Sequence, residues 1–305
     1  MKLLYFNDWR LGVLAGDNVV DVTDQLQDIP HRDSQDLMSG LIASWDKYKG
    51  KLEAAVKGGG GVPVSGVRLR APLPRPINLD CMAVNYMENG TLPAPAPING
   101  FHKSPSGIIG DDDTMVLGDV PASIFEGEAE LALVIGKTAT NVSEADAMSY
   151  VFGYTGFIDG SARGLTPGFY LMKSRETYAP MGPYLVTADE FKDPQNLAIK
   201  LTNNGVDQQV FNTNDMAHKL PRCVAWTSQI HTLNPGDVIA TGTNHRGLNP
   251  FMDGDKIELE VEGIGKLRIS VQDDLKRTWK RETRLMRQEQ GHKDPTPQTG
   301  GKYAK

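Results

Sequence analysis

Ten residues at positions 128–137, Glu-Ala-Glu-Leu-Ala-Leu-Val-Ile-Gly-Lys, constrain the fold more than any other stretch of the chain. Side chains on a β-strand alternate between two faces, so Glu128 and Glu130 project to the same side. Residues 131–135 are apolar on both faces, which is typical of a strand that is covered on both sides. The stretch therefore predicts two carboxylates at the point where a strand enters a packed interior.

Two ionised carboxylates in such a position repel one another and lose their hydration, and a divalent cation offsets both costs. Residues 257–262 offer an internal comparison, because acids recur there at every second position but alternate strictly with apolar residues. That pattern is typical of a strand with one solvated face. For Glu128 and Glu130 the pattern alone leaves open an edge strand with hydrated acids.

Length and composition narrow the class of protein. A chain of 305 residues can bury a large core in one large domain or two unequal ones. The net charge of -6 gives no electrostatic indication of nucleic-acid binding. Cys81 and Cys223 lack metal-ligand spacing, so free thiols in a reducing compartment are expected. Without a run of about 18 apolar residues, we expect a cytoplasmic protein that crosses no membrane and acts on small molecules.

Proline and glycine divide the chain into three expected parts. Residues 1–70 are expected to form a small N-terminal domain that ends at a connector stiffened by prolines. Residues 71–274 form the main domain. Residues 275–305 are expected to be a basic helix and tail that is solvated or clasps a partner subunit, because no aromatic platform for nucleic acid accompanies the charge. The many short strand patterns predict an α+β, mainly β, fold.

A third acid follows another buried strand. Residues 151–158 predict a strand that ends at Asp159, and a third carboxylate suits a hard cation such as Mg2+, Mn2+ or Ca2+. The absence of nearby Cys and His ligands argues against zinc. Taken alone, Asp159 also fits a turn or cap residue. The other expected elements are a hairpin over residues 3–20, helices over 34–55 and 220–231, and hairpins that turn at 203–205 and 263–265.

Taken together, these motifs resemble the fumarylacetoacetate hydrolase family. The resemblance covers about residues 68–272 and rests on six segments in the family's order. These segments are residues 81–86, 101–103, 128–137, 153–163, 173–183 and 233–243. The resemblance implies a β-roll or sandwich catalytic domain over residues 71–274, a small N-terminal domain and a homodimer.

The resemblance also implies a metal centre. Its ligands would be Glu128, Glu130 and Asp159, holding Mg2+ or Mn2+. Lys173 would face the substrate and the metal, and Thr177 would support the site from outside the ligand shell. The residues expected to bind a small carboxylate substrate are Tyr86, Asn89, Arg163 and Thr243, the last of them at the substrate carboxylate.

The sequence departs from the family at the group that activates water. Hydrolytic members carry a His after the Asn-Tyr pair and a Glu close behind it, and here these positions hold Asn89 and Leu92. Asparagine does not act as a base near neutral pH. The expected replacements are Glu88, His102 and His245, although either histidine also fits an exposed loop. The remaining histidines, His231 among them, have no expected role.

The resemblance and the departure lead to one expected function and two alternatives. The expected function is a Mg2+- or Mn2+-dependent hydrolase that cleaves a C–C bond in a small 2-oxo or 1,3-diketo carboxylate, of the acylpyruvate or diketo-acid type, through a metal-bound enolate. The loss of the dyad leaves decarboxylation, tautomerisation, hydration or lyase chemistry open. A catalytically idle metal-binding homologue is the other alternative, because fold alone does not determine function.

Overall fold

The computed structural model describes residues 1–166 and 168–304 and is built on one large sheet. In spatial order this sheet contains β4 (Val62–Pro63), β3 (Asn18–Asp21), β2 (Arg10–Ala15), β1 (Lys2–Phe6), β12 (Ala179–Thr187), β11 (Val151–Arg163), β10 (Ile124–Ile135), β15 (Val238–Ala240), β6 (Leu79–Met82) and β7 (Gly100–His102). Two short strands join its sides, β5 (Leu69–Arg70) at β1 and β8 (Ile108–Ile109) at β12. The predicted α+β, mainly β, fold is confirmed.

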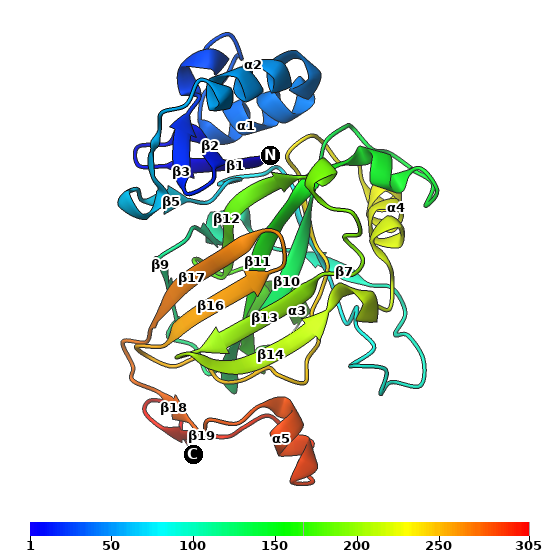
Figure 1. Ribbon diagram of the computed structural model, residues 1–305. Helices are drawn as coiled ribbons and strands as arrows, with labels where there is room; N and C mark the ends of the chain where they lie inside the picture. The colour runs from blue at the N-terminus through cyan, green and yellow to red at the C-terminus, as the bar shows by residue number, and fades with distance from the viewer. Residues whose placement is uncertain (167, 305) are drawn as a thin grey trace.

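A second, smaller sheet lies across β10, β11 and β12, as Figure 1 shows. Its strands are β14 (Val206–Asn212), β13 (Ala198–Asn203), β16 (Lys256–Val261), β17 (Gly265–Gln272) and β9 (Asp113–Val116). The hairpins predicted to turn at 203–205 and 263–265 join β13 to β14 and β16 to β17. The acids of β16 alternate with buried apolar residues, as predicted for a strand with one solvated face.

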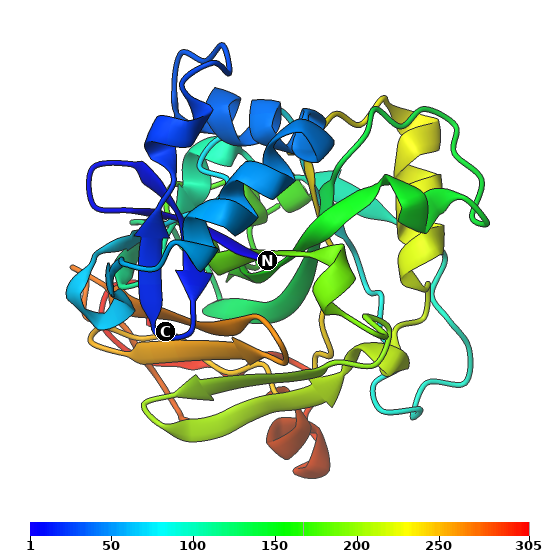
Figure 2. The same ribbon diagram turned by 45° about the horizontal axis from the view of Figure 1, so that its top comes forward.

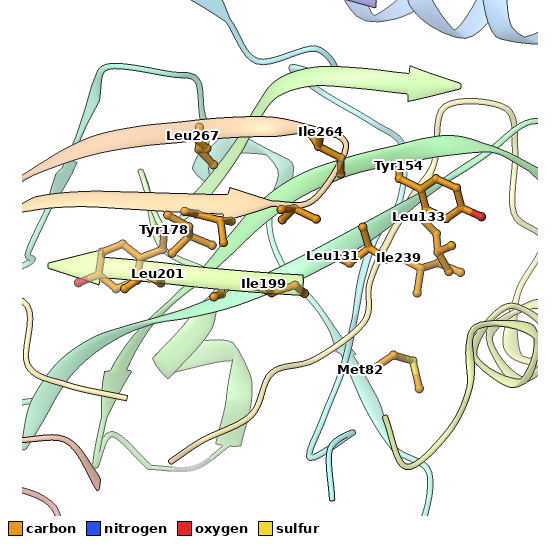
Figure 3. Close-up of a cluster of buried hydrophobic side chains, with 14 of the residues drawn as sticks. Met82, Leu131, Leu133, Tyr154, Tyr178, Ile199, Leu201, Ile239, Ile264 and Leu267 are labelled. Carbon is orange, nitrogen blue, oxygen red and sulfur yellow. The ribbon is translucent and has the colours of Figure 1, made fainter. Parts of the chain in front are cut away.

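The strand β10 is buried on both faces, as its apolar run predicts. On one face Leu131 and Leu133 belong to a core that includes Ile199 and Leu201 of the smaller sheet (Figure 3). On the other face Ala132 and Val134 pack in a second core with the N-terminal strands and helices. The central strand thus holds its polar residues in a fixed place between two packed layers.

The N-terminal part extends the large sheet, because β1 pairs with β12. It carries α1 (Ser34–Ala43) and α2 (Trp45–Lys57), drawn in blue in Figures 1 and 2. The single helix expected over residues 34–55 is interrupted at Ser44, whose backbone leaves the helical region at φ -116° and ψ 25°. Because this part shares a sheet and a core with the rest, the boundary expected near residue 70 stays a prediction.

The remaining helices are α3 (Gly168–Lys173), α4 (Leu220–Ile230) and α5 (Arg284–Glu289). None of the helices in the described part of the chain has the length and apolar character needed to cross a lipid bilayer.

The C-terminal segment differs from the long basic helix expected after residue 275. It contains a short strand pair, β18 (Thr278–Trp279) with β19 (Gln298–Gly300), and the short helix α5, shown in red in Figure 1. Arg277 is fully buried and donates to Asp273 and to three main-chain carbonyls of residues 117–120. These contacts hold the segment against its own chain in an irregular path, so it does not form a continuous solvated helix.

Candidate metal centre and active site

Three acids meet on one face of the two longest strands. Glu128 of β10 lies directly opposite Asp159 of β11 in the antiparallel register, and Glu130 is two residues further along the same face. One oxygen from each carboxylate lies within 4.8 Å of the others. The strand expected to end at Asp159 instead continues to Arg163, so Asp159 is fixed by the pairing with Glu128 rather than by a turn.

All three acids are buried, with exposures of 6% for Glu128, 0% for Glu130 and 1% for Asp159. This burial excludes the alternative of hydrated acids on an edge strand. Burial and the charges of Asp159 and Glu128 raise the pKa of Glu130 well above its usual value. Burial also opposes ionisation of Glu128, but the positive charges of Lys173 and Arg163 hold its pKa well below the usual value.

Glu130 offers an oxygen that suits a cation. Its Oε2 accepts the Gly242 N–H at 2.7 Å, whereas its Oε1 has no hydrogen-bond partner among residues 1–166 and 168–304. A buried carboxylate oxygen without a partner is costly, and a cation among the three acids would satisfy it. Because the donor set is entirely carboxylate oxygen, it fits a hard ion such as Mg2+ or Mn2+ better than zinc.

Two lysines contact the acids. Lys173, at the end of α3, donates to Glu128 Oε1 at 2.7 Å and to Asp159 Oδ2 at 2.5 Å. Lys103 follows β7 and donates to Asp159 Oδ1 at 2.5 Å and to the Lys173 carbonyl at 2.6 Å. Lys173 was expected at the site, and Lys103 was missed. The signal for Lys103 was its place in the family segment at residues 101–103.

The expected replacements for the water-activating dyad separate into two places. His245 Nδ1 lies 2.7 Å from Glu88 Oε1, and the His245 main-chain N–H lies 3.0 and 3.1 Å from the two Glu88 oxygens. His245 also acts, after Lys173 and Arg163, against the effect of burial on the pKa of Glu128. Glu88 and His245 therefore form a pair beside the three acids.

His102 lies elsewhere. Its Nε2 is 3.3 Å from Asp80 Oδ1, on the β6 strand that pairs with β7, while the adjacent Lys103 reaches Asp159. Because neighbouring residues along a strand point to opposite faces, His102 points away from the three acids. The structure thus places His102 in a separate cluster with Asp80 and His231.

Asn89, which stands at the family's histidine position, anchors the loop that carries Glu88. Its main-chain N–H donates to Asp215 Oδ2 at 2.8 Å, and its Oδ1 accepts from Asn244 Nδ2 at 3.1 Å. Glu88 and Asn89 both have positive φ, 54° and 58°, so the chain turns sharply here. This turn directs the Glu88 carboxylate toward His245.

The other residues expected at the site differ in their contacts. Tyr86 is buried, and burial and then the charge of Glu130 raise the pKa of its hydroxyl, which places the ring near the acids. The Thr243 hydroxyl donates to the Ala129 carbonyl at 2.7 Å and accepts from Gln209 at 2.8 Å, so it fixes the loop after β15. Thr177 accepts from the Val116 N–H at 2.9 Å, outside the ligand group.

A chain of ion pairs connects the acids to the C-terminal segment. Arg163 donates to Glu128 and also to Glu126 Oε2 at 3.0 Å, and Arg284 donates to the same Glu126 at 2.5 and 3.1 Å. A cavity of about 440 Å3 lies beside these groups, between β10 and the C-terminal segment. Sequence reasoning missed Glu126, although it continues the alternation of Glu128 and Glu130. The amino-acid sequence contains no local pattern that indicates a role for Arg284 at the site.

Comparison with known proteins identifies similar chains. A family model described as "Fumarylacetoacetate (FAA) hydrolase C-terminal" matches residues 81–272. A maleylpyruvate hydrolase of Aquipseudomonas alcaligenes is 34% identical over 289 residues, which are 89% of this chain and 99% of the relative. A mitochondrial oxaloacetate tautomerase of Xenopus laevis is 37% identical over 218 residues, which are 67% of this chain and 68% of the relative.

A solved structure is similar over almost the same length. It is maleylpyruvate hydrolase from Sphingobium sp. SYK-6 in complex with manganese(II) ion and pyruvate. The TM-score is 0.82 at 35% identity, over 90% of this chain and 99% of that chain. The cofactor expected from the sequence, Mg2+ or Mn2+, agrees with that structure.

Proposed function

Because the chain belongs to the fumarylacetoacetate hydrolase family, as its six sequence segments predicted, we propose that it is a Mg2+- or Mn2+-dependent hydrolase of small 2-oxo carboxylates. The substrate is of the acylpyruvate or diketo-acid type, and the bond that breaks is a C–C bond next to a carbonyl group. The observation that carries this proposal is the 2.7 Å contact between Glu88 and His245 beside the three acids. This pair supplies the base that the family's usual positions lack here.

The residues of the centre have complementary roles in this proposal. An ion held by Glu128, Glu130 and Asp159 would supply Lewis-acid stabilisation of the enolate that is released when the C–C bond breaks. Lys173 adds a positive charge next to two of these carboxylates. The pyruvate in the related Sphingobium structure supports this substrate class, because hydrolysis of an acylpyruvate releases pyruvate.

Glu88 and His245 determine how water is activated. A carboxylate only accepts hydrogen bonds, so His245 Nδ1 carries the hydrogen in its contact with Glu88. The lone pair of the neutral ring is then on Nε2, which takes a proton from water as the oxygen attacks the substrate carbonyl. The C–C bond breaks to give a carboxylic acid and an enolate, and the enolate carbon takes up the proton to give the second product.

Charge around the acids favours an anionic substrate. Four carboxylates (Glu126, Glu128, Glu130 and Asp159) and four cations (Lys103, Lys173, Arg163 and Arg284) lie together in the described part of the chain. These charges balance, the neighbouring Glu88 carboxylate adds one negative charge, and a divalent ion therefore leaves one positive charge over. A 2-oxo carboxylate balances this surplus, and the adjoining cavity lined by Arg163 and Arg284 offers a place for the second carboxylate of a 2-oxo dicarboxylate.

Tautomerisation of a 2-oxo dicarboxylate is the second candidate. It is favoured by the 37% identity to an oxaloacetate tautomerase. This reaction moves a proton between the enol oxygen and the carbon next to the carbonyl carbon, and it adds no water. The homodimer expected from the family belongs to the same proposal, and light scattering of the purified chain tests it.

The two reactions are separated by assaying Mn2+-loaded enzyme with maleylpyruvate and with oxaloacetate. We expect acid products from maleylpyruvate and a fall in kcat of about 100- to 10,000-fold in His245→Ala, with bound Mn2+ unchanged. Glu88→Gln keeps the shape of the side chain, so its kcat should fall less than that of His245→Ala. Hydrolysis that survives in His245→Ala would reject the pair as the base. Enol–keto exchange without acid products would establish the tautomerase instead.

A further inference from the structure

A second group of metal-ligating side chains lies on β6, on the edge strand β7 and just after α4. Figure 1 shows where β7 and α4 lie. Asp80 of β6 is directly opposite His102 of β7 in the antiparallel register, and His231 follows the end of α4. One ligand atom from each residue lies within 4.8 Å of the others. This group, which we call the histidine cluster, has no part in the mechanism above, because His102 points away from the three acids.

Asp80 is buried and only half satisfied. It is 7% exposed, and its Oδ1 lies 3.1 Å from His231 Nε2 and 3.3 Å from His102 Nε2. Its Oδ2 is also buried and has no hydrogen-bond partner among the residues that the structure describes. A carboxylate in a buried strand needs a positive charge or a donor at each oxygen. A further positive group at Asp80 would therefore satisfy the second carboxylate oxygen.

The His231 ring is oriented as a metal ligand. Its Nδ1 lies 3.2 Å from the Thr232 carbonyl oxygen, which only accepts, so Nδ1 carries the hydrogen. In the neutral ring the lone pair is then on Nε2, which faces Asp80 Oδ1 at 3.1 Å. Two lone pairs repel at that distance unless a cation or a second ring proton lies between them. Metal-binding histidines commonly donate their other ring N–H to a carbonyl in this way.

The donor set differs from that of the three acids. Two imidazoles with one carboxylate suit Zn2+ and similar ions, such as Co2+, whereas three carboxylates suit hard ions. The His102 side chain is 56% exposed, so the cluster is open to solvent on one side. A small cavity of about 100 Å3, lined in part by Phe101 and Trp226, adjoins it. This opening leaves a coordination position for water.

We propose that Asp80, His102 and His231 form a second metal site that binds Zn2+ or a similar ion through two ring nitrogens and one carboxylate. An ion here connects β6, β7 and the end of α4. The residue after His102 is Lys103, which contacts Asp159, so the second ion also fixes the strand that leads to the three acids. The proposal stands on this geometry and does not depend on the reaction proposed above.

The test counts and identifies the ions in the full-length protein. Chelated protein is titrated with Co2+, bound metal is measured after dialysis, and the visible absorption of nitrogen-ligated Co2+ is recorded. We expect two ions per chain in the wild type. We expect one ion in His102→Ala and in His231→Ala, each with loss of the nitrogen-ligand bands. His31→Ala is the matched control, because its ring hydrogen-bonds to the Ile29 carbonyl and belongs to neither ligand group, and it should keep both ions.

A variant of the three acids completes the test. Glu130→Gln should lose the other ion and retain the bands of the histidine cluster. A wild type that binds a single ion, or a second ion that remains in both histidine variants, would overturn the proposal, because the cluster would then be a plain Asp–His ion pair. If either histidine variant fails to fold, X-ray absorption of the Zn2+-loaded wild type decides. Scattering from two imidazoles is expected, and an oxygen-only shell would reject the site.

Discussion

The three acids and the histidine cluster are two solutions to the same problem, a buried carboxylate that needs positive charge. Glu128 and Asp159 stand opposite each other on the two longest strands, and their positions follow from the pairing of those strands. The histidine cluster joins two short strands and the end of a helix, and His102 is half exposed. Strand register can organise a group of ligands in advance, whereas a site made from the ends of elements depends more on the ion itself.

The three acids and the histidine cluster also differ in the positive charge that neighbouring side chains supply when no ion is bound. Lys103 and Lys173 donate to the three acids, so part of their repulsion is already offset. At the histidine cluster the hydrogen-bond and ion-pair partners of the Asp80 side chain among residues 1–166 and 168–304 are imidazole rings, and burial raises the pKa of Asp80. This difference in charge compensation between the two regions can be tested by four experiments.

Removal of the ion from the three acids should abolish turnover, and Mg2+ or Mn2+ should restore it. Glu130→Ala should lose both bound Mn2+ and activity, because it removes a ligand that is fully buried. The measurements are metal content and initial rate. Glu260→Ala, on the solvated face of β16, is the control and should change the free energy of unfolding by no more than about 0.5 kcal/mol. Activity that is indifferent to chelation would remove the basis of the comparison.

Lys103→Met should lower the free energy of unfolding of the metal-free protein by about 3 to 5 kcal/mol, because it leaves Asp159 buried with one partner fewer. Added Mn2+ should recover part of this loss by supplying the missing positive charge. Chemical denaturation with and without Mn2+ measures both effects. Equal destabilisation in the two conditions would show that Lys103 acts through packing and not through charge compensation.

Arg284→Ala should raise KM for a 2-oxo dicarboxylate about tenfold, which corresponds to about 1.4 kcal/mol, and should change KM for a monocarboxylate analogue less. The reason is that Arg284 lines the cavity beside Arg163 and shares Glu126 with it. Lys302→Ala, in the same C-terminal segment but paired with exposed Asp119, is the control. A uniform loss for both substrates would indicate a structural role for Arg284.

Asn89→Ala should have the smallest effect, with turnover reduced less than tenfold and stability lowered by about 1 kcal/mol. The variant loses the contact with Asn244 and places alanine at a φ of 58°, which alanine adopts at a cost. Asn89→Gly relieves that backbone cost but also lacks the contact with Asn244, so it should recover part of the stability. A fall in turnover of about 100-fold or more would show that Asn89 takes part in the chemistry.

Local patterns in the sequence predicted the parts of the site that lie on a single strand. Glu128 and Glu130 were recognisable because period-two alternation places them on one face and the following residues are apolar. Asp159 was recognisable as a third carboxylate after a buried strand, and the family resemblance made it a ligand, whereas Lys173 came from the resemblance. The pairing of Glu88 with His245 was not visible, because the loop after Tyr86 and the loop after β15 meet only in the folded chain. Both residues were named, but their contact was not.

Other features had no local signal at all. Arg284 and His231 reach partners that are distant in the sequence, so neither has a pattern around it that reports its contact. The basic segment after residue 275 has helical composition, yet its arginines bind groups of its own chain and keep α5 short. Tertiary hydrogen bonds overrode local preference there. Such long-range side-chain contacts determine which residues meet and where short helices end, and the periodicity of the sequence does not predict them.

The direct opposition of Glu128 and Asp159 across β10 and β11 makes ion uptake a check on the assembly of the protein. A slip of one residue between these strands would turn one acid to the far layer and leave a cage of two. Under the proposed function, a newly made chain therefore gains its three-acid site only when β10 and β11 have paired in the correct register. Occupancy of this site, as distinct from the histidine cluster, would then measure folding quality as well as activity.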